Sequence, residues 1–379
     1  MNQKITSRIA PTPSGFLHAG NVYNFLLTYL FTRAFDGILY LRIDDYDLLR
    51  YRRQYVENIF RVLDMLGIDF DGGPGGVGEF ETKFSSKFRL GAYQNALKTL
   101  EQKGVCYACE CSHSMKSSFK NGIYSRVCAE KNLKFKKDET AMRLRTIDEA
   151  QINVRQNLVN FDALRRGFCA EASLAGGLWS NSQKAQDGAA NGLKNLTNSC
   201  SFGGGKPGGK KFNLNAVENL EDHILNSANS DGLNLMDEAI FETEKFAQTQ
   251  SVNLSQILGD FVIWKKDDTP AYNLASLVDD EMLGINLLVR GEDLLACSAA
   301  QKYATQILGY GFESANFIHH GLLAREGKKL SKSSHAPAVS ITDGAKIHYK
   351  FAALKLGLDA SKCESLSNLL EMFKEKFGR

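Results

Sequence analysis

The sequence has no apolar run long enough to cross a membrane, and its polar start, Met1-Asn-Gln-Lys4, is unlike a secretory signal. It also lacks a strong net charge, because 46 basic residues are offset by 43 acidic ones to leave only +3. Any RNA contact must therefore come from a local basic face. The eight cysteines show no regular disulfide-like spacing, which indicates a reducing compartment. We expect a cytoplasmic, monomeric protein with no membrane partner.

What the chain does contain is an alternation of short apolar strands and amphipathic helices. With 379 residues, 43% of them hydrophobic, it can bury a substantial core and divide into two or three domains. The elements that we expect in its first part are strands at 5–10 and 38–43 and helices at 22–35, 54–66 and 88–103. Further strands are expected at 141–145 and 285–289, and a hairpin-like pair of strands around 265–268. This order predicts an α/β nucleotide-binding fold with a parallel sheet.

The most informative stretch is Arg8-Ile-Ala-Pro-Thr-Pro-Ser-Gly-Phe-Leu-His-Ala-Gly-Asn21. Its Pro/Gly turn at 11–15 places a helix N-terminus at the carboxyl edge of the sheet, where backbone amides and the helix dipole favour a phosphate. His18 and Asn21 lie three positions apart and can face one ligand. Gly20 leaves room for an adenine or ribose against the backbone. Taken alone, a histidine at a helix start is more often a cap or a solvated residue.

A second stretch, Gly327-Lys-Lys-Leu-Ser-Lys-Ser-Ser334, places Lys329 and Lys332 three positions apart in a loop. Such a run can equally be a solvated basic turn. Together with the first stretch, however, it indicates two cationic groups that converge on one triphosphate. The combination predicts activation of a carboxylate with ATP.

Both stretches resemble the signature motifs of the class I aminoacyl-tRNA synthetases, which end in His-x-Gly-His and read Lys-Met-Ser-Lys-Ser. Further blocks resemble the glutamyl branch: Leu41-Arg-Ile-Asp-Asp-Tyr-Asp47, Thr269-Pro-Ala-Tyr-Asn-Leu-Ala275, Val278-Asp-Asp280 and Val289-Arg-Gly-Glu-Asp293. The resemblance covers 1–165 and 254–340 in collinear order. It implies a Rossmann-like catalytic domain that uses ATP with Mg²⁺, L-glutamate and a tRNA.

The resemblance also implies roles for single residues. Glutamate would be bound by Arg8, Ala10, Thr12, Asp44, Tyr272 and Arg290, and ATP by His18, Gly20 and Lys332. The activation step would use His18, Asn21, Lys329 and Lys332. Arginine suits the substrate carboxylates because its planar fork donates two parallel hydrogen bonds. Asp44 stands where the family has a glutamate that reads the substrate amino group, and it is one methylene shorter.

A cysteine cluster lies between the two halves. Cys109, Cys111 and Cys128 supply three thiols within a short stretch, and zinc needs four convergent ligands. Spacing alone leaves the fourth ligand open. The candidates are Tyr124, Cys106 and His113. The family resemblance selects Tyr124 and implies a closed, structural zinc site; the alternative is a set of reduced cysteines packed in a core.

These patterns predict five segments. They are the first half of the catalytic domain at 1–104, a zinc-containing insertion subdomain at 105–167, a Gly/Ser/Asn-rich insertion at 168–253, the second half of the catalytic domain at 254–340 and a short helical segment at 341–379. The glycine-rich run 203–211 is typical of a flexible linker. We interpret the insertion as a surface excursion; contact of its lysines with RNA phosphates is the weaker alternative.

The chain ends soon after Ser333, whereas glutamyl-tRNA synthetases continue into a large anticodon-binding part. We therefore expect a shortened relative that resembles the glutamyl-queuosine tRNA(Asp) synthetases, which attach glutamate to queuosine in tRNA(Asp). The run His335-Ala-Pro-Ala338 and the cysteine cluster favour this interpretation. Two others remain: a truncated glutamyl-tRNA synthetase that charges a tRNA 3′ end, and a synthetase-like protein that binds without catalysis. Intact His18, Lys329 and Lys332 argue against the last.

Overall fold

The computed structural model describes residues 4–112, 119, 123–148, 151–154, 250–322, 324–325, 328–329, 338–342 and 344–377. The predicted linker at 203–211, the candidate ligand His113 and the predicted catalytic Lys332 lie outside these residues. Among the described helices, none has the length and apolar character that a bilayer span requires.

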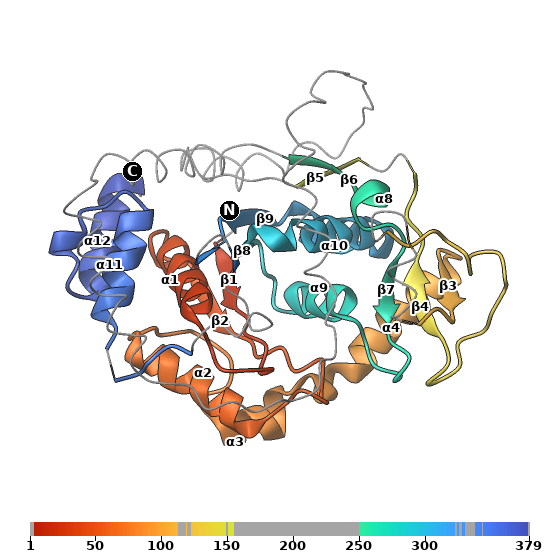
Figure 1. The fold of residues 1–379 in the computed structure, drawn as a ribbon, viewed down its shortest axis with the longest axis horizontal. Helices are drawn as coiled ribbons and strands as arrows, with labels where there is room; N and C mark the ends of the chain where they lie inside the picture. The colour runs from red at the N-terminus through yellow and green to blue at the C-terminus, as the bar shows by residue number, and fades with distance from the viewer. Residues whose placement is uncertain are drawn as a thin grey trace.

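Two parallel strand pairs form the centre of the molecule. β1 (Thr6–Ile9) pairs with β2 (Ile38–Leu41), and β8 (Leu287–Gly291) pairs with β9 (Asn316–His320). The pairs meet where Asn286 N donates to Thr6 O at 3.0 Å and Thr6 N donates to Asn286 Oδ1 at 2.8 Å. Figure 1 shows β1 beside β8, so that strands from the two halves of the chain meet at the centre. The predicted parallel α/β architecture is confirmed.

The helices form two hydrophobic cores around these strands. The first core contains α1 (Ala19–Arg33), α2 (Arg53–Met65), α11 (Lys346–Lys355) and α12 (Leu366–Phe377). The second contains α4 (Leu90–Gln102), α9 (Tyr272–Met282) and α10 (Leu295–Leu308). A short helix α3 (Val77–Glu79), a π-helical turn (Phe80–Phe84) and a 3₁₀ turn (Ser86–Arg89) connect α2 to α4. The predicted helices are present, with ends shifted by up to three residues because caps set the boundaries.

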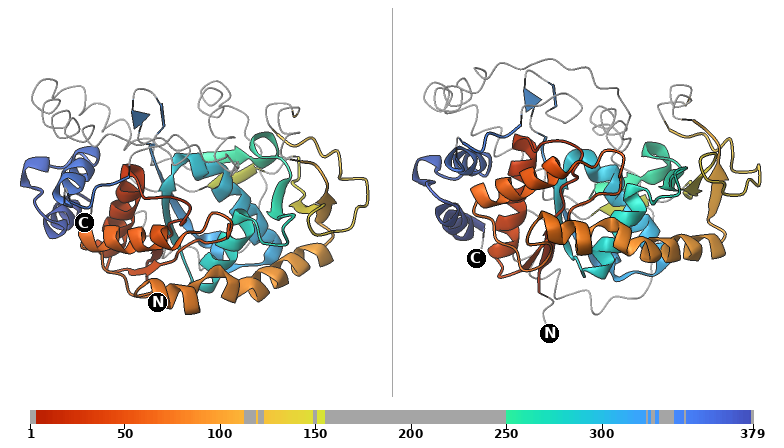
Figure 2. Two further views of the ribbon diagram at one scale, coloured as in Figure 1. Left: turned by 60° about the horizontal axis from the view of Figure 1, so that its bottom comes forward. Right: turned by 90° about the horizontal axis from the view of Figure 1, so that it is seen from below.

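The C-terminal helices close the first core against α1, as both views in Figure 2 show. Phe31 of α1 meets Phe373 of α12 edge-to-face, with ring centroids 5.0 Å apart. Tyr349 Oη donates to Leu66 O at 3.0 Å, which links α11 to the end of α2. The helical segment expected at the C-terminus is therefore an integral part of the first core.

A small antiparallel sheet stands beside the second core. It has the order β3 (Cys106–Cys109), β4 (Ala141–Leu144), β7 (Phe261–Trp264). A separate ribbon joins β5 (Gln151–Val154) to β6 (Gln250–Asn253), followed by the short helix α8 (Leu254–Ile257). β5 thus pairs directly with β6, which is made of the last four residues of the segment that the sequence assigned to the insertion at 168–253.

One predicted element is only partly right. The hairpin expected around 265–268 has β7 as its first strand, but its second strand is reduced to a single bridge between Trp264 and Pro270. Hydrogen bonds from Lys265 N to Thr269 O at 2.8 Å and from Ala271 N to Ile263 O at 2.9 Å flank this bridge. The ladder ends there because Ala271 is already the N-cap of the helix that begins at Tyr272. The turn is also held by Trp264, whose Nε1 donates to Asp268 Oδ1 at 2.9 Å.

Candidate active site and cysteine cluster

A buried cluster of charges lies at the carboxyl ends of β1, β2 and β8. Asp280 of α9 is at its centre and accepts hydrogen bonds from Arg8 Nε at 2.8 Å and from Arg42 Nη1 at 2.7 Å. Arg290 approaches from the other side, with Nη2 4.0 Å from Asp280 Oδ2. All three arginines are at most 5% exposed, and Asp280 is fully buried. The structure therefore brings Arg8 and Arg290, predicted from opposite ends of the chain, to one carboxylate.

This cluster has an excess of positive charge. Besides Asp280 the cluster contains a second carboxylate, Asp44, which accepts from Arg42 Nε at 2.7 Å and from Arg42 Nη2 at 3.1 Å. Three guanidinium groups therefore face two carboxylates. Arg290 Nη1 donates to Gln301 Oε1 at 2.9 Å, whereas its buried Nε and Nη2 have no hydrogen-bond partner among the described residues. Buried cations are normally paired, so this arrangement is complementary to an additional carboxylate.

Burial and the neighbouring charges change the pKa values of the cluster. Burial acts to raise the pKa of Asp280, but Arg42 and Arg8 outweigh it and hold that pKa below its usual value. Burial lowers the pKa of the Arg290 guanidinium, and Tyr272 opposes this shift. Asp44 differs from Asp280, because burial raises its pKa despite the contact with Arg42. Asp280 is thus the carboxylate best fitted to stay ionised.

A cavity of about 130 Å³ opens beside the cluster. Its lining includes three of the predicted glutamate-binding residues, Thr12, Asp44 and Tyr272. The other lining residues are Ser14, Tyr46, Asp47, Arg50, Lys265 and Pro270. Ala10, Arg8 and Arg290 are not among the lining residues. Because Tyr272 lies close enough to affect the pKa of Arg290, the cavity and the arginine cluster are adjacent.

The predicted nucleotide motif forms the cap of α1. His18 is the N-cap residue, and its Nδ1 accepts a hydrogen bond from Gly20 N at 3.1 Å. In return Asn21 Oδ1 accepts from His18 N at 3.0 Å, which completes a capping box. A Cβ at Gly20 would lie 3.0 Å from His18 Cε1, so glycine is needed here for the histidine ring as well as for any ligand. The side-chain oxygen of Asn21 is thus already used to accept the capping hydrogen bond from His18 N.

The lysine loop is described only in part. β10 (Ala324–Arg325) and β11 (Lys328–Lys329) form a short antiparallel hairpin in which Ala324 pairs with Lys329. Lys329 therefore lies in a short hairpin that follows β9 in the chain.

The cysteine cluster has the predicted membership. The sulfur atoms of Cys109, Cys111 and Cys128 all lie within 4.8 Å of one another, and Cys111 Sγ is 3.6 Å from Cys128 Sγ. Tyr124 Oη is 3.4 Å from Cys109 Sγ and accepts a hydrogen bond from Cys128 N at 3.0 Å. Burial acts to raise the pKa of the Cys109 thiol, but hydrogen bonds with Tyr124 and Arg143 bring it to about 7. A partly ionised thiol is suited to metal binding.

These distances fit a tetrahedral zinc ion. Zn–S bonds of about 2.3 Å at tetrahedral angles place two sulfurs about 3.8 Å apart, and a Zn–O bond of about 2.0 Å gives an S–O separation near 3.5 Å. The S–S separation of 3.6 Å between Cys111 and Cys128 is close to the first value. The S–O separation of 3.4 Å between Cys109 and Tyr124 is close to the second. Of the two other candidates for the fourth ligand, Cys106 is not in the cluster, and His113 lies outside the described residues.

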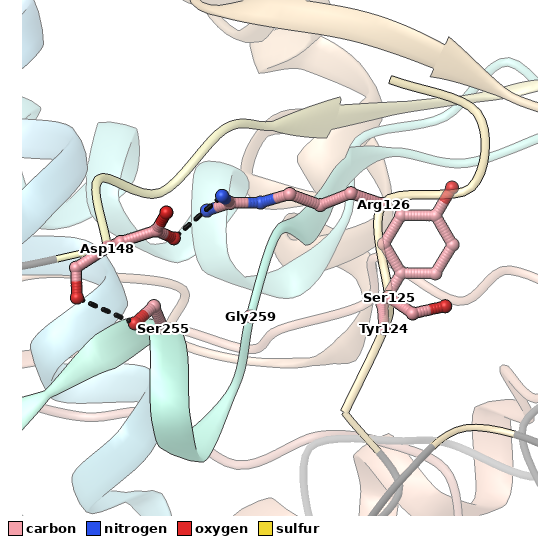
Figure 3. Close-up of a pocket in the computed structure, with 6 residues that line it drawn as sticks. All are labelled: Tyr124, Ser125, Arg126, Asp148, Ser255 and Gly259. Carbon is pink, nitrogen blue, oxygen red and sulfur yellow. Dashed lines mark hydrogen bonds and ion pairs between the residues drawn. The ribbon is translucent and has the colours of Figure 1, made fainter. Parts of the chain in front are cut away.

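The cluster is anchored to the second core through Arg126 and Asp260. Asp260 is fully buried and accepts from Tyr107 Oη at 2.7 Å, Arg126 Nε at 3.1 Å and Thr146 N at 2.8 Å. Arg126 also reaches Asp148 across a cavity of about 230 Å³, shown in Figure 3. Because Arg126 and Ser255 are both already bonded to Asp148, we assign this cavity no ligand.

A comparison with known protein families identifies the family of this chain. The family model for the catalytic domain of class I tRNA synthetases (E and Q) matches residues 4–160 and 236–358. The chain belongs to this family. Among curated relatives, a glutamate–tRNA ligase 2 of Syntrophus aciditrophicus is 28% identical over 86% of this chain and 51% of its own length. A glutamyl-Q tRNA(Asp) synthetase of Pseudomonas putida is 26% identical over 89% of this chain and 79% of its own length.

Solved structures agree with this synthetase fold. The glutamate–tRNA synthetase of Elizabethkingia anophelis superposes with a TM-score of 0.57 at 17% identity, covering 98% of this chain and 66% of that chain. The chain spans about half the length of the curated glutamate–tRNA ligases that it matches. The predicted membership in the class I aminoacyl-tRNA synthetases is confirmed.

Sequence reasoning missed several residues of this synthetase site. Asp280 and its neighbour Asp279 were recognised as part of a motif but were given no role. Two adjacent aspartates directly after the apolar pair Leu277-Val278 carried the signal, because buried carboxylates require cationic or hydroxyl partners. Tyr46 was missed as well, although it stands in the same block as Asp44.

Proposed function

We propose that this synthetase activates L-glutamate with ATP and transfers the glutamyl group to queuosine in the anticodon of tRNA(Asp). The observation that carries the first half is the buried excess of positive charge around Asp280. Glutamate brings one side-chain carboxylate, which neutralises that excess, and Arg290 Nε and Nη2 provide donors for it. Thr12, Asp44 and Tyr272 line the adjacent cavity, where the rest of the amino acid would lie.

Activation requires an in-line attack of the substrate α-carboxylate on the α-phosphorus of ATP, which releases pyrophosphate. The protein performs little proton chemistry in such a step, so positioning and charge stabilisation dominate. We assign His18 and the first amides of α1 to the phosphates, and Lys329 and Lys332 to the charge that develops on pyrophosphate. ATP is expected to arrive with Mg²⁺, which shares that charge.

A substitution at Arg290 tests the glutamate subsite. We expect Arg290→Lys to raise the KM for glutamate about tenfold. A guanidinium can donate two parallel hydrogen bonds to a substrate carboxylate while it also donates to Gln301, and the compact ammonium of lysine lacks this planar fork. The KM for ATP stays unchanged. Glutamate-dependent exchange of labelled pyrophosphate into ATP measures both values, and Arg145→Lys, at a half-exposed position paired with Glu130, is the matched control. An unaltered KM for glutamate contradicts the assignment.

The acceptor is supported by the relatives rather than by any single residue. The glutamyl-Q tRNA(Asp) synthetases of Pseudomonas putida and Acinetobacter baylyi match over 79% and 84% of their own lengths. In the transfer step, a queuosine hydroxyl would attack the glutamyl-adenylate carbonyl, so that an ester forms and AMP leaves.

The acceptor prediction is tested with tRNA(Asp) that lacks its 3′-terminal adenosine. We expect labelled glutamate to be transferred to this shortened tRNA undiminished, because the queuosine hydroxyls are intact. Queuosine-free tRNA(Asp) with a complete 3′ end is the control and should accept none. The reverse result would identify an enzyme that charges the tRNA 3′ end. A chain without glutamate-dependent exchange would be a binding protein.

We further propose that Cys109, Cys111, Tyr124 and Cys128 bind a structural zinc ion. With four protein ligands the ion has no open position for a reacting water, so it would stabilise the subdomain and take no part in activation. His113 has no role in this assignment.

Zinc removal gives a separate prediction. Metal analysis should find one zinc per chain. A protein kept at free zinc of about 100 to 1,000 times the dissociation constant should lose about 3 to 4 kcal/mol of unfolding free energy when a chelator removes that zinc. Cys128→Ser should lose the metal. Cys363→Ser, at a buried thiol beside the C-terminal helices, should retain it. Full zinc content in Cys128→Ser would contradict the ligand set.

A further inference from the structure

Tyr46 forms a rigid part of the cavity wall next to Asp44. Its ring is 8% exposed, and its Oη donates to Asp279 Oδ2 at 2.7 Å. Asp279 is held in turn by Arg89, through bonds of 2.7 and 2.9 Å, and by Tyr93 Oη at 2.8 Å. The backbone carbonyl of Tyr46 accepts a hydrogen bond from Lys265 Nζ at 3.1 Å. The ring is therefore fixed before any substrate binds.

A second aromatic ring completes a corner of the cavity. The centroids of Tyr46 and Tyr272 are 6.4 Å apart, and their planes are inclined at 60°. Tyr46, Tyr272 and Asp44 all line the same cavity of about 130 Å³. A small cation in this space would meet two tyrosines and two acidic residues, Asp44 and Asp47, and Asp47 is already paired with Arg50. Aromatic faces attract cations within about 6 Å of the ring centroid.

Asp44 alone is a weak anchor for a cation. Both of its oxygens already accept from Arg42, so much of its charge is neutralised. The cations at the cavity wall are also paired, Lys265 with Asp267 at 3.3 Å and Arg50 with Asp47 at 3.4 Å. A substrate ammonium bound here therefore needs a second source of attraction, and the tyrosine rings are the groups in place to supply it.

We propose that Tyr46 contacts the α-ammonium group of the amino acid substrate through its ring face and, with Asp44 and Tyr272, selects α-amino acids over plain dicarboxylates. This inference rests on the proposed binding of glutamate in this cavity and names a residue that recognises its amino group. Asp279 acts on the substrate only through Tyr46 and is a positioning residue.

The experiment compares glutamate with glutarate, which has both carboxylates and no ammonium. Calorimetry measures the binding of each compound to the unmutated protein, Tyr46→Phe and Tyr46→Leu. We expect Tyr46→Leu to weaken glutamate about tenfold and glutarate less than about twofold, and Tyr46→Phe to keep affinity for both within about threefold. The KM for ATP in pyrophosphate exchange should be the same in all variants that bind glutamate.

Fluorinated phenylalanines at position 46 provide a second measurement that preserves the size of the ring. Each added fluorine weakens the negative face, so glutamate affinity should fall stepwise while glutarate affinity stays constant. Equal changes for glutamate and glutarate, or constant glutamate affinity across the series, would overturn the role of Tyr46. An unmutated protein that binds glutamate but performs no exchange would overturn the proposed activation and leave this inference standing. A protein that binds no glutamate overturns both.

Discussion

Asp280→Asn should lower the free energy of unfolding by about 3–5 kcal/mol, because it removes the acceptor that Arg8 and Arg42 share inside the protein. The asparagine has nearly the same size, so the loss measures charge rather than packing. With Asp280 neutral, Asp44 is the one carboxylate among the described residues that still forms an ion pair with any of the three buried guanidinium groups. Breaking a buried ion pair from one side is costly because the remaining charge stays desolvated.

The pH dependence of this loss has a definite sign. Arg42 and Arg8 hold the pKa of Asp280 below its usual value even though burial acts to raise it. A lowered carboxyl pKa contributes stability that is present above the pKa of the unfolded chain, about 3.9, and that is lost as pH falls through the lower folded pKa. The stability difference between the unmutated protein and Asp280→Asn should therefore stay constant from neutral pH to about pH 4 and shrink below it.

Urea unfolding at several pH values measures this difference. Asp267→Asn is the matched control, because Asp267 is a half-exposed carboxylate 3.3 Å from Lys265, and its loss should cost less than about 1 kcal/mol. A stability change for Asp280→Asn as small as that of the control would show that the three arginines do not depend on Asp280.

The adjacent positions of Asp279 and Asp280 explain how one helix organises two sides of the site. Successive residues of α9 point about 100° apart, so Asp280 faces the arginines while Asp279 faces Tyr46, Arg89 and Tyr93. Tyr272 begins the same helix and lines the cavity. The position of α9 thus sets the geometry of the proposed carboxylate and ammonium subsites together.

Sequence patterns predicted the strands and helices of this site better than the contacts between its side chains. The strand and helix around His18 follow from local turn chemistry and apolar periodicity, which act over a few residues. The contact of Arg8 with Asp280 joins residues 272 positions apart, and nothing in a single sequence encodes that pairing. The hairpin expected around 265–268 has only a single bridge for its second strand, because the chain turns into helix α9 at Tyr272 directly after that bridge.

The cysteine cluster was predictable for a different reason. Cys109 and Cys111 are joined by one intervening residue, so their proximity is local, and only the approach of Cys128 and Tyr124 required the fold. Sequence spacing left the fourth ligand open. The structure favours Tyr124 over Cys106 as the fourth candidate ligand, because Tyr124 Oη lies 3.4 Å from Cys109 Sγ and accepts a hydrogen bond from Cys128 N.

His18→Asn should reduce the rate of glutamate-dependent pyrophosphate exchange about a hundred- to a thousandfold while leaving the fold intact. His18 Nδ1 accepts from Gly20 N, so the proton of the neutral ring is on Nε2, which can donate to a phosphate oxygen. Asparagine is a favourable N-cap residue and can accept the same backbone hydrogen bond, but its shorter side chain cannot present a donor at the Nε2 position.

His18→Ala separates the two roles of the histidine. It removes both the cap and the donor, so it should lose the same activity as His18→Asn and, in addition, about 1 kcal/mol of stability. Thermal unfolding measures the cap, and exchange kinetics at saturating ATP and glutamate measure the donor. If His18→Asn kept nearly full activity and His18→Ala lost it, the ring would act only by starting α1. Equal loss of activity in both, with a stable asparagine variant, requires that the imidazole contact the reacting phosphates.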